Sequence, residues 1–119
     1  MGGDAVAFKN SWSGLKVAFR NDRNVRILVA ALLAAVPLSL VVGFSPLVSA
    51  ALICVVVLAL AVELLNTAIE ELADHVTPEH NPDIKRTKDF ASAAVFLTRL
   101  LAAFVWGATL VERAVFGIW

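Results

Sequence analysis

The sequence lacks several features on which common classes of protein depend. Cys54 is its single cysteine, so no disulfide can form within the chain and no CxxC metal motif exists. Ten basic residues are balanced by ten acidic ones. This balance leaves no positive surplus to bind nucleic-acid phosphates, and we expect no nucleic-acid partner. Neither GxxxxGK(S/T) nor GxGxxG occurs, so the phosphate-binding loops of soluble nucleotide folds are absent.

Hydrophobic residues, in contrast, make up 60% of the 119 positions, and the mean hydropathy is strongly positive. A soluble domain of this length does not carry so many apolar side chains. We therefore predict an all-α integral membrane protein that forms a single membrane domain over residues 1–119.

Three apolar segments are long enough to cross a bilayer, which takes about 20 residues as a helix. We expect the first transmembrane helix at about residues 25–42, the second at about 47–73 and the third at about 84–112. The uncharged stretch 43–46 (GFSP) predicts a short hairpin between the first two. The second helix continues beyond the hydrocarbon as a cytoplasmic extension, until prolines in the polar loop 77–83 end it.

Residues 6–21, ahead of the first span, have the pattern of an amphipathic surface helix. Phe8, Trp12, Leu15 and Phe19 recur at spacings of three and four, while the basic residues fall elsewhere on the helical wheel. A core helix of a soluble protein has the same period, but the basic face beside a membrane span favours an interfacial helix.

Basic residues predict the orientation of the chain in the membrane. Five precede the first span and three lie at the second loop: Lys9, Lys16, Arg20, Arg23, Arg26, Lys85, Arg86 and Lys88. Because basic loops stay on the cytoplasmic side, we expect the N-terminus on the cytoplasmic side of the membrane. The C-terminus then lies on the periplasmic or extracellular side.

Acidic side chains line one face of the second helix. At about 100° per residue, Asn66, Glu70 and Asp74 lie within roughly 60° of Glu63. A carboxylate within an apolar helix is costly and therefore a functional candidate. Glu70, with Asp22 as a second ligand, suits Mg²⁺, which takes carboxylate oxygens together with substrate phosphates and water. Glu63, nearer the apolar layer, is placed to accept the proton of a lipid hydroxyl.

Alternatives remain open at this point. The acidic face can also be a line of polar contacts between packed helices, and the basic loop can be a topology signal alone. Arg99, within the third apolar segment, can snorkel, pair with an acid or line a headgroup site. His75 and His80 are interpreted as loop residues, since no third metal ligand stands near them.

Residues 61–70 (AVELLNTAIE), 88–95 (KDFASAAV) and 11–16 (SWSGLK) resemble the small prokaryotic diacylglycerol kinases, a family that includes undecaprenol kinases. The resemblance covers about residues 8–97. It implies a homotrimer of three-span chains with active sites shared between neighbouring chains. It also implies ATP-dependent, Mg²⁺-dependent phosphorylation of diacylglycerol to phosphatidic acid at the cytoplasmic face of the inner membrane.

The resemblance also implies roles for individual residues. Glu63 and Asn66 match catalytic positions, with Glu63 as the general base, and Asp22 and Glu70 match metal ligands. Residues that match the nucleotide site are Asn10, Asp22, Glu70, Glu79, Lys88 and Asp89. Residues that match the lipid-substrate site are Trp12, Lys16, Phe19, Arg26, Glu63 and Ser92.

The chain departs from the family pattern at a few positions. Asp22 stands where Glu is usual, and His80-Asn81 replaces a common Tyr-His pair. The stretch 22–27 (DRNVRI) is more similar to undecaprenol kinases, whereas 91–95 (ASAAV) is more similar to diacylglycerol kinases. Undecaprenol kinase is therefore the alternative substrate assignment. A small proton-coupled transporter and a non-catalytic membrane subunit are further alternatives, although such transporters typically have four spans.

Overall fold

The computed structural model describes residues 3–77 and 79–117, and every regular element within them is an α-helix. The helices are α1 (Gly3–Asn21), α2 (Arg23–Val42), α3 (Pro46–Val76) and α4 (Pro82–Phe116). Helices α2, α3 and α4 are each long and apolar enough to cross a membrane. The predicted all-α chain with three potential membrane spans is thus confirmed.

Local sequence sets the ends of the helices. The side chains of Asp22, Ser45 and Asn81 each accept a hydrogen bond from a backbone N–H in the first turn of the next helix. Pro46 and Pro82 then occupy the first helical position, where the missing N–H costs nothing. Gly117 ends α4 in the left-handed conformation, with φ of 61°.

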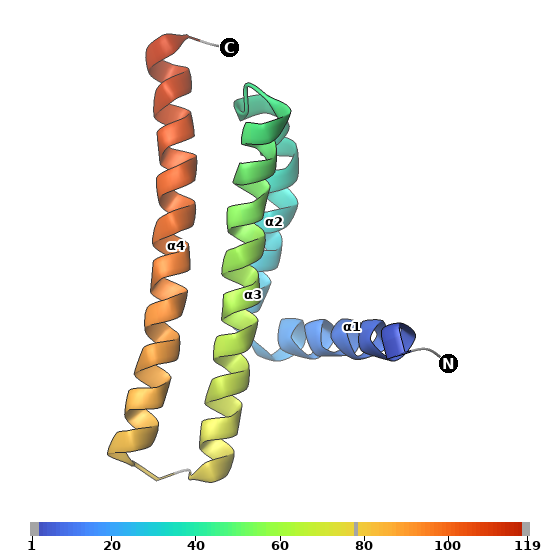
Figure 1. Cartoon of the computed structure of the whole chain (residues 1–119), viewed down its shortest axis with the longest axis vertical. Helices are drawn as coiled ribbons and strands as arrows, with labels where there is room; N and C mark the ends of the chain where they lie inside the picture. Colours follow the sequence, from blue (N-terminus) through green and yellow to red (C-terminus); the bar gives the residue numbers. More distant parts are fainter. Residues whose placement is uncertain (1–2, 78, 118–119) are drawn as a thin grey trace.

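Helix α3 is the centre of the bundle, because it packs against both α2 and α4 (Figure 1). Apolar side chains fill these contacts, chiefly Val25, Ala35, Leu52, Val56, Ala59, Leu60 and Ala91. Polar contacts connect the same helices: the Trp106 indole donates to the Leu52 carbonyl at 3.0 Å, and Arg113 donates to the Val41 carbonyl at 2.7 Å. A Cβ on Gly43 would clash with the Ser49 hydroxyl of α3 and lie 3.1 Å from the Ser49 backbone nitrogen, so the close approach of the hairpin to α3 favours glycine there.

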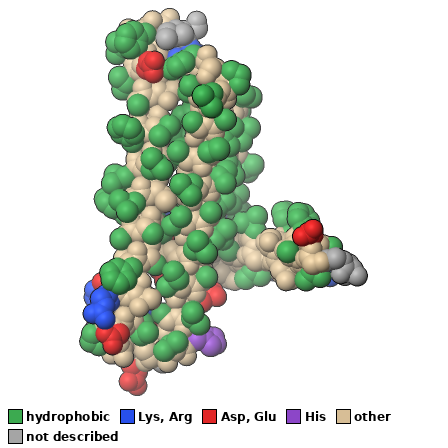
Figure 2. Space-filling model, in the orientation of Figure 1, with side chains coloured by type: hydrophobic (Ala, Val, Ile, Leu, Met, Phe, Trp, Pro, Cys, Tyr) green, Lys and Arg blue, Asp and Glu red, His purple; other side chains and the backbone are tan. Residues whose placement is uncertain are grey.

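Helix α1 projects sideways from the bundle, and α3 and α4 continue past its level to the loop that joins them (Figure 1). With 31 residues, α3 is about 46 Å long, which exceeds the roughly 30 Å of a hydrocarbon core. Apolar side chains cover most of the bundle above α1, and most of the charged side chains seen in this view lie at the end where α3 and α4 are joined, with a few at the opposite end and on α1 (Figure 2). The molecule therefore has one polar end, and α1 lies near its border with the apolar surface.

Candidate active site between α1, α2 and α3

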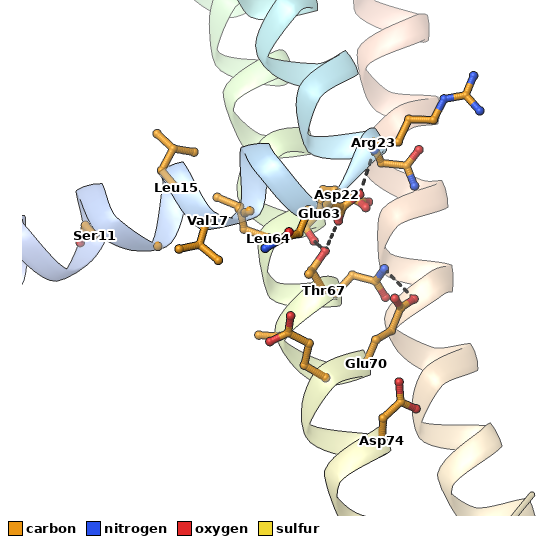
Figure 3. A pocket seen from close by; sticks show the side chains of 17 residues that line it. Ser11, Leu15, Val17, Asp22, Arg23, Glu63, Leu64, Thr67, Glu70 and Asp74 are labelled. Atoms are coloured by element: carbon orange, nitrogen blue, oxygen red, sulfur yellow. Dashed lines mark hydrogen bonds between the residues drawn. The ribbon is translucent and has the colours of Figure 1, made fainter. Parts of the chain in front are cut away.

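A cavity of about 1020 Å³ lies in the angle where α1 turns into α2 beside α3 (Figure 3). Helix α1 contributes mostly small and apolar side chains to its wall, among them Leu15 and Val17. The α1–α2 junction contributes Asp22 and Asn24, and α3 contributes the polar face that runs from Glu63 to Asp74. The cavity thus has an apolar side and an acidic side, which suits a ligand with both kinds of surface.

The acidic side of the cavity is a row of polar side chains along α3, formed by Glu63, Asn66, Glu70 and Asp74, which we call the acidic ladder. Glu63 is 2% exposed, and its Oε2 has no hydrogen-bond partner within the described part of the chain. The same holds for Oδ1 of the buried Asn66, whose amide nitrogen donates to Glu70 Oε1 at 3.2 Å. Buried polar atoms normally have partners. Two unused acceptors side by side are therefore suited to an incoming donor or cation.

Asp22 is held in place by two contacts. Its side chain accepts a hydrogen bond from the Asn24 N–H at 2.8 Å, which caps α2, and it also accepts one from the Thr67 hydroxyl. Thr67 additionally contacts the Glu63 carbonyl oxygen at 3.1 Å. Sequence reasoning missed Thr67 and Asn24. Thr67 could have been found, because it follows Glu63 by four residues and so lies on the same helical face.

The side-chain oxygens in this part of the cavity are suited to bind a hard divalent cation. Carboxylate and amide oxygens bind such cations, and Asp22, Asn66 and Glu70, which carry such oxygens, all line the cavity. No group of three or more His, Cys, Asp or Glu side chains lies close enough to hold a metal among residues 3–77 and 79–117. With so few carboxylates, these residues suit a cation that also binds phosphate and water oxygens.

The start of α4 contributes cations next to this ladder. Lys88 Nζ lies 2.7 Å from Asp74 Oδ1, across the gap between α4 and α3. The neighbouring charges pair within α4 itself: Lys85 with Asp89 at 2.7 Å, and Arg86 with Asp83 at 2.9 Å. Lys88 is therefore the basic residue of this group that the fold brings to the carboxylates.

Of the residues predicted for the site, the cavity brings together Asp22, Glu63, Asn66 and Glu70. Arg26 instead donates to the carbonyls of Phe19 and Arg20, at 3.1 and 3.0 Å, in the last turn of α1. The remaining predicted residues lie outside the lining: the half-buried Lys88 and the exposed Asn10, Trp12, Lys16, Phe19, Glu79, Asp89 and Ser92.

Comparison with known proteins gives one family. A model of the family described as prokaryotic diacylglycerol kinase matches residues 9–110. The chain is 36% identical over 104 residues to a diacylglycerol kinase of Haemophilus influenzae, covering 86% of each protein. It is 37% identical over 100 residues to the one of Pseudomonas aeruginosa, covering 84% of this chain and 81% of the relative. For the Escherichia coli K12 enzyme the identity is 34% over 96 residues, with 81% and 79% covered. The chain therefore belongs to the prokaryotic diacylglycerol kinase family, a family of membrane lipid kinases.

Proposed function

We propose that this protein transfers the γ-phosphate of ATP to diacylglycerol, yielding phosphatidic acid and ADP, in the cavity between α1, α2 and α3. The observation that carries the proposal is the buried carboxylate of Glu63 at the apolar end of an acidic ladder. A lipid hydroxyl at headgroup depth meets Glu63, while the polar end of the ladder, at Glu70 and Asp74, faces the loop that connects α3 to α4.

Glu63 acts as the general base. As the lipid oxygen bonds to the γ-phosphorus and the bond from that phosphorus to ADP breaks, the hydroxyl proton passes to the Glu63 carboxylate. Asn66, one turn further along α3, presents its unused Oδ1 beside the reacting groups. Such a base contributes about 10²- to 10⁴-fold to the rate.

Asp22 and Glu70 would hold Mg²⁺, which also binds phosphate oxygens of ATP. When bound, the metal neutralises the charge that develops on the phosphates. The Thr67 hydroxyl and the Asn24 N–H keep the Asp22 carboxylate oriented toward this position. Lys88 exchanges its contact with Asp74 for a phosphate oxygen, and Asn10, Glu79 and Asp89 contact the rest of the nucleotide.

Helix α1 lies in the membrane interface and guides the lipid to the cavity. None of its residues is buried in the single chain, and Trp12 and Phe19 are 55% and 43% exposed. An apolar face without a protein partner beside an apolar bundle is suited to lipid. Trp12, Lys16, Phe19, Arg26 and Ser92 contact the lipid substrate in this proposal.

The polar end of the bundle faces the cytoplasm, where ATP is present. Lys85, Arg86 and Lys88 all lie at this end, at the start of α4, as basic cytoplasmic loops do. The N-terminus is then cytoplasmic and the C-terminus is on the opposite side.

The active enzyme is a homotrimer with sites shared between chains. Within one chain, Asp89 and Ser92 on α4 and Asn10 and Trp12 on α1 lie outside the cavity lining. A neighbouring chain can supply these residues, and it also covers part of the apolar surface of α4, which is largely unburied in the single chain.

Undecaprenol is the second candidate substrate, because residues 22–27 resemble the undecaprenol kinase pattern and three of them, Asp22, Arg23 and Asn24, line the same cavity. Both lipids present a primary hydroxyl on a long apolar body, so the catalytic residues are the same. The two assignments differ only in which lipid is phosphorylated.

The test is phosphate transfer from γ-labelled ATP to each lipid in detergent micelles, with Mg²⁺ and with EDTA. We expect Mg²⁺-dependent labelling of diacylglycerol that Glu63→Gln lowers at least 100-fold, while cross-linking still detects the trimer. Glu112→Gln is the matched control, since it makes the same change at the far end of α4. Transfer that is undiminished in Glu63→Gln refutes the proposed chemistry, and transfer to undecaprenol alone reassigns the substrate.

A further inference from the structure

Arg99 is a basic residue inside the apolar part of α4, at a depth where a positive charge is costly. It belongs to neither the basic loop nor the first turn of the helix, so the orientation signal of the chain does not account for it. Its side chain is 47% exposed, whereas that of Glu63 is 3% exposed. A positive charge at this depth is explained when a buried negative group nearby is stabilised by it.

That partner is Glu63. Arg99 Nη2 lies 3.6 Å from Glu63 Oε2, within ion-pair distance but beyond hydrogen-bond distance. The same Oε2 is buried and accepts no hydrogen bond from any described residue. Among the described residues, Arg99 is also the only basic side chain that forms an ion pair with Glu63. It therefore offsets the cost of burying this carboxylate.

The pair has a counterpart at the other end of the acidic ladder. Lys88, Ser92 and Arg99 lie within about 40° of one another on α4, at about 100° per residue. Lys88 pairs with Asp74 near the loop, and Arg99 pairs with Glu63 nearer the apolar layer. Two ion pairs thus cross from α4 to α3, one at each end of the row of polar side chains from Glu63 to Asp74.

We propose that Arg99 is a positioning residue for phosphoryl transfer, which holds the Glu63 carboxylate directed toward the lipid hydroxyl. This inference rests on the proposed function, because it assigns Glu63 the role of base. Without Arg99 the buried carboxylate lacks its ion-pair partner, and it turns away from the cavity. Glu63 then no longer reaches the proton of the lipid hydroxyl.

The test combines kinetics with a double-mutant cycle. Arg99→Met removes the charge and retains most of the side-chain length. We expect kcat to fall about 10- to 100-fold while KM for ATP and for the lipid stays within about threefold, and we expect Arg99→Lys to recover part of kcat. In a Glu63→Gln background, Arg99→Met should lower the residual rate no further. Thr98→Val, at the neighbouring position of α4, is the control for a lost polar group at this depth and should leave kcat unchanged.

Thermal unfolding in detergent supplies a readout that does not depend on activity. Arg99→Met should lower Tm when Glu63 is present and not when residue 63 is glutamine, because neutral glutamine needs no counter-charge. The inference is overturned by an unchanged kcat in Arg99→Met, by a change in KM alone, by an equal fold loss in the Glu63→Gln background or by the absence of thermal coupling. If the unaltered protein labels neither lipid, the proposed function fails, and the thermal cycle still decides whether the two residues are paired.

Discussion

The hydroxyl of Thr67 donates a hydrogen bond to the carboxylate of Asp22, a residue 45 positions earlier in the chain. This contact connects the middle of α3 to the junction of α1 and α2. The junction is where α1 leaves the bundle and where Asp22 lines the cavity. The Thr67 hydroxyl therefore attaches this junction to α3 and also orients a proposed metal ligand.

Replacing Thr67 with valine, which has nearly the same shape, removes only this hydroxyl. We expect the free energy of unfolding to fall by about 1 to 3 kcal/mol, as for other hydrogen bonds to charged groups, and half-maximal activity to require more Mg²⁺ because Asp22 is no longer held. Thr67→Ser keeps the hydroxyl and should behave as the unaltered protein. The measurement is a Mg²⁺ titration of the initial rate, and an unchanged titration in Thr67→Val would show that Asp22 is not a metal ligand or does not need support.

Asp22 combines a structural and a proposed catalytic role that substitutions can separate. Asparagine caps helices as well as aspartate does, so the free energy of unfolding of Asp22→Asn should lie within about 0.5 kcal/mol of that of the unaltered protein. The variant should still lose most of its activity, because it lacks the negative charge that binds the metal. Asp22→Ala should lose the activity and also more stability than Thr67→Val, because it removes the α2 cap, worth about 0.5 to 2 kcal/mol, together with the hydrogen bond from Thr67. Parallel unfolding and transfer assays check both statements, and full activity in Asp22→Asn contradicts the metal role.

The helices and the acidic face could be predicted from the sequence because both depend on short-range periodicity. Long apolar runs give spans whatever surrounds them, and these are the helices that the structure contains. The turn of one helix fixes the directions of Glu63, Asn66, Glu70 and Asp74 relative to one another, and all four line one cavity.

The contacts between helices could not be predicted in the same way. Pairing of Thr67 with Asp22, Arg99 with Glu63 and Trp106 with the Leu52 carbonyl depends on how far each helix is rotated and shifted along its axis. Residue spacing along the chain does not determine these quantities. The roles assigned by resemblance to residues of α1 and α4, such as Lys16 and Ser92, stay predictions, because these residues lie outside the cavity of one chain.

Lys88 and Asp74 form an ion pair in which both partners are partly exposed, 37% and 62%. Such a pair contributes only about 0 to 1 kcal/mol to stability, so its main effect is to keep Lys88 beside the carboxylates. We expect Asp74→Asn to retain activity within about threefold, and Lys88→Met to raise the KM for ATP at least tenfold, since it removes a phosphate contact worth roughly 1.4 kcal/mol or more. ATP titrations of both variants provide the measurement. Equal losses in the two variants would show that Lys88 serves the ion pair alone.

Helix α1 offers a test of the membrane arrangement that is independent of catalysis. If α1 lies in the interface, the Trp12 indole is at the boundary between headgroups and acyl chains, and brominated lipids should quench its fluorescence. A variant with Trp106→Phe and Trp119→Phe leaves Trp12 as the only tryptophan. We expect lipids brominated near the headgroup to quench it more strongly than lipids brominated near the chain end, because an interfacial helix sits only about 5 to 10 Å into the bilayer. Strong quenching by a water-soluble quencher, with no effect of either lipid, would place α1 in solution and remove its proposed part in delivering the lipid.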